Sequence, residues 1–341
     1  MFDKNECKRA MHKPYNNKIL SITFGVLLVL YLITQFTGGE ANERNFRTDL
    51  VTMDTASVNR IVLYPKEGDE VTFTQEQENW QASQGEITAQ ADQQAVQSLL
   101  GTLLQLEPQR LAARSEEKWN TFEVTDSLGS RVQAYNGESI LADVYVGKFT
   151  IQQMPQQPMQ PGMPPMQQQR PKATSYVRLA DEAEVYAVDG FLTTSFNRQF
   201  NSWRDRNFLQ LDKENISRIS FQYPADSSFT LALTDSVWII NDTPADSAQT
   251  AQYLNQIARL TSSDFADDFN AQGQSPAFQA RIEGNNMSPV TIEGYENSGS
   301  FVLRNSLKPD VLVSSDSSGL YLRVFKGKSA FTNSGTNFSN P

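Results

Sequence analysis

Apolar and polar residues alternate along much of this 341-residue chain, and the same alternation occurs twice. Residues 54–61 read DTASVNRI, and residues 212–219 read DKENISRI, at a shift of 158 positions. The match continues without a gap to Trp80 and Trp238, with apolar residues meeting apolar residues at alternate positions. A period of two is typical of strands that bury one face. The pattern therefore predicts two equivalent sheets.

A helical pattern follows each set of matched strands, at a shift of 154 positions. Asp92 and Asp246 stand where their carboxylates can accept the free N–H groups of a first helical turn. After each aspartate, positions spaced i, i+3, i+4 and i+7 form a stripe that a helix would lay on a sheet. The stripe consists of Val96, Leu99, Leu100, Leu103 and Leu106 in the first copy, and of Thr250, Tyr253, Leu254, Ile257 and Leu260 in the second.

Further alternating segments complete each copy, such as ILADVYVGKF in the first and VTIEGYE in the second. The predicted fold class is α+β, with an N-terminal transmembrane helix followed by two tandem duplicated modules. Each module is expected to be an antiparallel sheet with one main packed helix. The first module is placed at residues 46–207, the second at 208–331, and a disordered polar tail at 332–341.

The apolar segment near the start predicts a membrane anchor. Residues 19–36 are 18 consecutive residues without a charge, close to the lower limit for a helix that spans a bilayer. Five Lys and Arg residues precede it, so we expect a cytoplasmic tail at 1–18 and a single-pass helix at 19–37. The bulk of the chain is then periplasmic or extracytoplasmic, at the cell inner membrane. A cleaved signal peptide is the alternative, but no convincing cleavage site follows.

Composition excludes several kinds of chemistry. The formal net charge is −10 and the basic excess is confined to residues 1–18, which disfavours a nucleic-acid partner. Cys7 and His12 are the only cysteine and histidine. The chain beyond them therefore has no disulfide, no Cys/His zinc site, no Ser-His-Asp triad and no Cys-His dyad. We expect a protein that is not an enzyme and uses no cofactor, and we assign no catalytic, cofactor-binding or metal-ligating residue.

One low-complexity stretch interrupts the repeat. Residues 152–169 consist only of Gln, Pro, Met and Gly, which predicts a flexible loop at 150–172 between two strands. Its four methionines are Met154, Met159, Met163 and Met166. Thioethers are soft ligands that can hold Cu(I), but the irregular gaps argue against a prearranged site. Copper binding by this loop is therefore an alternative to a simple spacer.

Several segments together resemble a known family. The strand VNRIVLY, the helix QAVQSLLGTLLQL, the pair YVRL and VYAVDGF, and the stretch SWRDRNFLQLD are similar to the bacterial family called domain of unknown function 4340. Trp203, Arg204 and Asp205 match its most recognisable stretch, which we interpret as a helix end docked onto the start of the second copy. The family's Tyr-Gly-Leu turn appears only as KWNTFEV, and the Met/Gln/Pro loop is extra. The resemblance implies an accessory role beside gliding-type ABC transporters and brings no catalytic residues.

These observations lead to three hypotheses. The first is a non-catalytic, membrane-anchored, extracytoplasmic binding or scaffold protein, an accessory component of an ABC-type envelope transport system with a protein partner in that complex. The second is a glycan-binding or carboxylate-dependent glycan-cleaving envelope domain, suggested by Trp80, Trp238, Tyr295 and the many acidic residues. The third is copper binding by the Met-rich loop.

Overall fold

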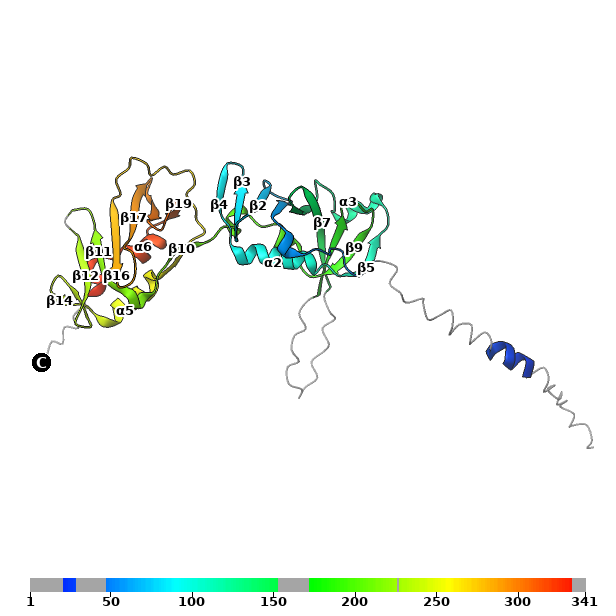
Figure 1. The fold of residues 1–341 in the computed structure, drawn as a ribbon, viewed down its shortest axis with the longest axis horizontal. Coiled ribbons are helices and arrows are strands. Elements are labelled where there is room, and N and C mark those ends of the chain that lie inside the picture. Colours follow the sequence, from blue (N-terminus) through cyan, green and yellow to red (C-terminus); the bar gives the residue numbers. More distant parts are fainter. Residues whose placement is uncertain (1–20, 29–46, 153–171, 226, 333–341) are drawn as a thin grey trace, which may run out of the picture. The chain divides into compact units, whose positions relative to one another are not determined.

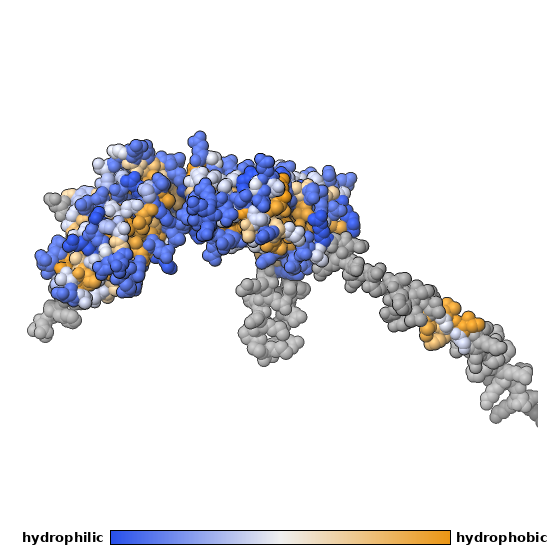
Figure 2. All heavy atoms as spheres, in the orientation of Figure 1, coloured by the Kyte–Doolittle hydropathy of each residue, from blue (hydrophilic) through white to orange (hydrophobic). Residues whose placement is uncertain are grey.

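The computed structural model describes residues 21–28, 47–152, 172–225 and 227–332 (Figure 1). The chain divides into one unit at 1–48 and a second at 49–341. In the first unit, residues 21–28 are helical, and Ile22, Phe24 and Leu27 are exposed. The space-filling view colours this helix as hydrophobic (Figure 2).

The prediction of a transmembrane helix at 19–37, and of a cell-inner-membrane location for the chain, is contradicted. Among the helices that the structure describes, none combines the length and the apolar character needed to cross a membrane. Residues 21–28 are the only part of 19–37 described, and the predicted cytoplasmic tail at 1–18 lies outside the described residues. An uncharged run in the sequence is a necessary feature of a spanning helix, and it is not sufficient to establish one.

A nine-stranded antiparallel sheet occupies the first half of the second unit. Its strand order is β4-β3-β2-β1-β6-β7-β8-β9-β5. The strands are β1 (Arg60–Tyr64), β2 (Val71–Glu76), β3 (Asn79–Gln84), β4 (Ile87–Gln90), β5 (Pro108–Ala113), β6 (Ser130–Asn136), β7 (Ser139–Gln152), β8 (Lys172–Leu179) and β9 (Val185–Asp189). The helical elements are η1 (Thr55–Ser57), α2 (Gln93–Leu104), η2 (Glu116–Lys118), α3 (Trp119–Phe122), α4 (Thr193–Phe196) and η3 (Phe200–Ser202).

An eight-stranded antiparallel sheet follows, in the order β14-β13-β12-β11-β16-β17-β18-β19. Its strands are β11 (Ile216–Gln222), β12 (Phe229–Thr234), β13 (Val237–Ile240), β14 (Thr243–Pro244), β16 (Phe278–Gly284), β17 (Val290–Asn297), β18 (Ser300–Asn305) and β19 (Lys308–Ser315). A separate pair joins β10 (Asn207–Gln210) to β15 (Arg259–Thr261). The helical elements are η4 (Lys213–Asn215), α5 (Ser247–Ile257), α6 (Leu320–Val324) and η5 (Lys328–Phe331).

The predicted fold class, a transmembrane helix followed by two α+β modules, is therefore wrong. Two large antiparallel sheets of nine and eight strands dominate the described chain, and no spanning helix precedes them there. The long helical stripes become only α2 and α5, of 12 and 11 residues, because the last stripe residues, Leu106 and Leu260, lie beyond the helix ends. Leu260 instead belongs to β15.

Individual repeated elements agree with the sequence pattern. The Asp92 carboxylate accepts the Ala95 N–H, and the Asp246 carboxylate accepts the Gln249 N–H, so the two predicted helix caps are confirmed. Asp54 and Asp212 cap the short helices η1 and η4 in the same way. The module boundaries at 46–207 and 208–331 stay a prediction. The loop at 150–172 lies outside the described residues between 153 and 171, as does the tail from 333 onward.

Alternate side chains of each sheet form its core. In the first sheet Ile61 pairs with Phe73 and both are fully buried, and Val96 and Leu99 of α2 are buried as well. The second core gathers the corresponding side chains around α5, where Tyr253 is buried and donates its hydroxyl hydrogen to the Val324 carbonyl over 2.7 Å. Hydrophilic residues cover most of the surface in the space-filling view (Figure 2). Each fully buried aliphatic or aromatic side chain contributes about 1.5–3 kcal/mol to such a core.

The two helix caps predict a measurable stability loss. Asp92→Ala and Asp246→Ala each leave a first-turn N–H group without its acceptor, and we expect each to lower the free energy of unfolding by about 1 kcal/mol. Urea denaturation followed by circular dichroism would measure the change. Asp69→Ala is the matched control, because Asp69 is exposed and outside any helix. Equal stability of the cap variants and the control would contradict the capping role.

Buried tyrosines predict a loss of stability in alkali. Burial raises the pKa of Tyr253 and of Tyr223, and burial followed by the hydrogen bond to Glu293 raises the pKa of Tyr295 to about 12. The folded chain therefore holds phenol protons that the unfolded chain releases near pH 10. The stability that these retained protons give the folded chain is complete below about pH 10, and it is lost as the pH rises through the raised pKa values.

We expect the urea midpoint to fall between about pH 9 and about pH 12. Tyr253→Phe should reduce the slope of that fall, because one of the linked protons is removed. A midpoint that stays constant over this interval, with tyrosine ionisation proceeding normally in the ultraviolet spectrum, would contradict the account.

Candidate functional site

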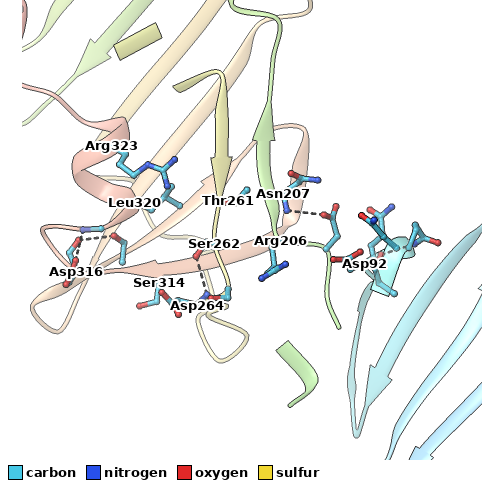
Figure 3. A pocket seen from close by; sticks show the side chains of 18 of the residues that line it. Asp92, Arg206, Asn207, Thr261, Ser262, Asp264, Ser314, Asp316, Leu320 and Arg323 are labelled. Atoms are coloured by element: carbon cyan, nitrogen blue, oxygen red, sulfur yellow. Dashed lines mark hydrogen bonds between the residues drawn. The ribbon is translucent and has the colours of Figure 1, made fainter. Parts of the chain in front are cut away.

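A polar cleft of about 1120 Å³ lies in the described part of the chain (Figure 3). One wall consists of the end of β4 and the start of α2, residues 90–94. A second consists of residues 205–207 at β10 and 261–264 after β15. The third runs from Ser314 in β19 to Arg323 in α6. Loop and strand ends from distant parts of the sequence therefore meet here.

Hydroxyl, amide and charged groups dominate the lining. The hydrogen-bonding residues are Gln90, Asp92, Gln93, Gln94, Asp205, Arg206, Asn207, Thr261, Ser262, Ser263, Asp264, Ser314, Ser315, Asp316, Ser318 and Arg323. None of the described residues that line the cleft is aromatic. Such a surface can make many hydrogen bonds and offers no platform on which a ring could stack.

Three of the four carboxylates in the cleft already have structural partners. Asp92 caps α2, and Asp205 accepts both the Asn207 N–H and the Lys308 ammonium. Asp316 accepts the N–H groups of Ser318 and Gly319 and the Ser318 hydroxyl, and the bonds from Ser318 lower the pKa of Asp316. A general acid needs a raised pKa, so Asp316 is not suited to that role.

Two arginines give the cleft positive charge. Figure 3 places Arg206 and Arg323 on different walls. Arg323 donates to the Arg259 carbonyl over 3.3 Å. The Arg206 guanidinium forms no hydrogen bond or ion pair with any residue in the described ranges, so its donors remain free for a ligand.

A three-residue connection, Trp203–Arg204–Asp205, leads from η3 to the cleft, which Asp205 lines. Its backbone joins the first sheet, because the Asp92 N–H donates to the Trp203 carbonyl and the Asp205 N–H donates to the Gln90 carbonyl, each over 2.8 Å. The Trp203 ring is 1% exposed and meets the Phe73 ring edge-on, with 5.2 Å between centroids. Trp203 thus anchors the connection in the first core.

The next side chain, Arg204, reaches Phe265 and Asp267, in the segment that covers part of the second sheet. Its guanidinium donates two hydrogen bonds to the Asp267 carboxylate, of 2.6 and 2.9 Å. It also stacks on the Phe265 ring, 3.6 Å from the centroid, and lies 5.5 Å from that of Phe200. A bidentate pair of this kind is both strong and geometrically specific. The Trp203–Asp205 stretch is thus the end of the short helix η3, with Trp203 packed in the first core and Arg204 paired with Asp267.

The residues suggested for glycan binding lie elsewhere. Trp80 is 5% exposed and Tyr295 is 2% exposed, so both belong to the packed interior of their sheets. Trp238 is half-buried against the second core. The structure brings none of the three into the cleft. The methionines proposed for copper lie outside the described residues, and the described chain holds no group of three or more His, Cys, Asp or Glu suited to a metal ion.

Sequence reasoning missed a second buried arginine. Arg178 of β8 is 4% exposed, between the rings of Trp119 and Tyr145, at 3.8 and 4.0 Å from their centroids. It donates to the Val124 carbonyl, and burial lowers its pKa. The signal was a single arginine within the otherwise apolar run YVRL. Arg178 holds the segment around α3 against the sheet and is remote from the cleft lining.

Breaking the Arg204–Asp267 pair should destabilise the chain. Asp267→Asn removes the charge and leaves the buried guanidinium with poorer acceptors, so we expect the free energy of unfolding to fall by about 2 kcal/mol. Glu283→Gln is the control, because Arg281 and Glu283 form an exposed pair that should contribute under about 1 kcal/mol. Urea denaturation of both variants would measure the two losses of stability. Equal losses would contradict the claim that the Arg204–Asp267 pair stabilises the chain more than the exposed pair does.

Comparison with known proteins gives one match. No curated protein and no solved structure matches the chain at a significant level. One family model matches residues 168–279, a segment that includes the Trp203–Asp205 connection and α5. The family resemblance found in the sequence is thus supported over this segment, which is similar to the family described as Domain of unknown function (DUF4340).

Proposed function

We propose that this protein is a non-catalytic binding or scaffold protein that holds an extended polar segment of a protein partner in the cleft. The observation that carries the proposal is the lining itself, with hydroxyl, amide and charged groups on all three walls. A cleft of about 1120 Å³ has room for several residues of a peptide. Arg206 supplies unpaired donors for carbonyl or carboxylate groups of that segment.

The strand edges are poor docking surfaces, which favours the cleft. The edge strands β4 and β14 have four and two residues. The β5 edge begins at Pro108 and contains two register shifts, and residues 264–266 bond along part of β19. Short, bulged, proline-bearing and covered edges are the devices that prevent a further strand from adding.

The engaged carboxylates support a binding role over a hydrolytic one. Retaining and inverting glycosidases both need a carboxylic acid with a raised pKa beside a second carboxylate. Asp316 has the opposite shift, while Asp92 and Asp205 hold local structure. The glycan hypothesis also lacks an aromatic side chain among the described lining residues, so we do not favour it.

The partner that we propose is a component of an ABC-type transport system. This part rests on the family likeness, which covers residues 168–279. The physical requirement on the partner is an exposed, polar, unstructured segment or loop, since a folded apolar surface would leave the cleft's polar groups without partners.

Site-specific photocrosslinking in cells that express the chain tests this function. A benzophenone amino acid at Ser263 lies in the cleft, whereas the same group at Ser139, an exposed residue at the start of β7, is the matched control. We expect one protein adduct from Ser263, identified by mass spectrometry as a transport component, and none from Ser139. Arg206→Ala should reduce the yield of the adduct from Ser263 several-fold, whereas Arg110→Ala, on the distant β5 edge, should not.

An adduct of equal yield at both positions, or none at Ser263, would contradict the proposal. An adduct with a glycan in place of a protein would favour the hypothesis of a glycan-binding or glycan-cleaving domain. Each outcome can be read from the same gel and the same mass spectra.

A further inference from the structure

Arg204 is the most buried member of any ion pair among the described residues. Its side chain is 5% exposed, whereas the Asp267 side chain is 30% exposed. Water can therefore reach the carboxylate and cannot reach most of the guanidinium. The Arg204 Nε atom is buried and has no hydrogen-bond partner, and the same is true of the adjacent Trp203 Nε1 atom. The Arg204 guanidinium bonds through its terminal nitrogens to Asp267 and, over 3.3 Å, to Asn201 Oδ1.

The connection at 203–205 joins every wall of the cleft. Its backbone bonds to Gln90 and Asp92, which line the first wall. Arg204 bonds to Asp267, in the segment that follows the second wall. That segment bonds in turn to β19, where the Ser314 N–H donates to the Asp264 carbonyl and Ser314 lines the third wall.

Neighbouring side chains of the connection make contacts with different parts of the chain. Trp203, which ends the short helix η3 with φ −97° and ψ −11°, packs against Phe73 of the first core. Arg204 stacks on Phe265 and bonds to Asp267. Asp205 adds a second tie, accepting Lys308 Nζ over 2.7 Å at the start of β19.

We propose that the Arg204–Asp267 pair is a latch that sets the separation of the cleft walls. The closed latch holds the walls at one width, and release of the solvent-accessible Asp267 carboxylate lets the second and third walls move away from the first. A cavity of about 20 Å³ beside Arg204, lined by Gln90, Phe265 and Lys308 among others, leaves room for a water molecule to take the carboxylate's place. The latch deepens the proposed function, because it regulates the same cleft.

Distance measurement by pulsed electron resonance tests the latch without any ligand. Cys7 is the only native cysteine, so Cys7→Ser allows two spin labels at Gln94→Cys and Ser317→Cys in the full chain. Both positions are exposed, one on the first wall and one in the turn between β19 and α6. We expect a single narrow distance distribution in this background and a distribution at least about twice as broad after Asp267→Asn.

Two further variants make the result specific. Arg204→Met should broaden the distribution to the same extent, and the double variant should add nothing, because both changes remove one interaction. Glu293→Gln is the matched control, since Arg304 and Glu293 form a short pair within the second sheet, and it should leave the distribution narrow.

An unchanged distribution in Asp267→Asn, with circular dichroism showing a folded chain, would overturn the latch. Equal broadening by Glu293→Gln would also overturn it, because the effect would then be general loosening. Neither result depends on crosslinking to a partner, so failure of the latch and failure of the proposed function are distinguishable.

Discussion

The anchoring of the connection 203–205 at two places is the constraint on which the cleft depends. Trp203 is packed in the first core, and Arg204 is paired with Asp267, in the segment that covers part of the second sheet. The backbone between them is bonded to the residues that begin α2. If either anchor were lost, the walls would lose their common support.

A period of two builds the sheets on either side. Alternate residues such as Ile61 and Phe73 are paired and fully buried, and the positions between such residues on neighbouring strands carry polar and aromatic side chains. In the first sheet, Arg131 forms a bidentate pair with Asp143, and Tyr145 donates to Asp126. In the second, Arg304 and Tyr295 both bond to Glu293. Such ladders cover the sheet face with satisfied polar groups, which keeps it from becoming an apolar docking surface.

Sequence reasoning succeeded where one local rule decides the structure. Asp92 and Asp246 were identifiable as caps because the N-terminal amides of a helix need acceptors within a few residues. The matched strand pairs followed from their period. The repeated layout as predicted failed because short strands such as β5, β14 and β15 carry too little pattern to be recognised, and because the uncharged run at 19–36 did not become a described spanning helix.

The cleft could not be predicted from the sequence in the same way. Its lining comes from segments as distant as Gln90 and Arg323, and their meeting depends on tertiary packing. Arg204 could be singled out only through its place in the WRD stretch. Its partner Asp267 is one of three acids between residues 264 and 268, and nothing in that polar run distinguishes it from the others.

Amide hydrogen exchange at Asp92 and Asp205 tests the central claim most directly. Both N–H groups donate to the connection or to the strand end it joins, over 2.8 Å. The account predicts that both amides exchange as slowly as those of the central strand β1, because opening them requires Trp203 to leave the first core. Exchange of these two amides at the rate of an exposed loop, while β1 stays protected, would contradict it.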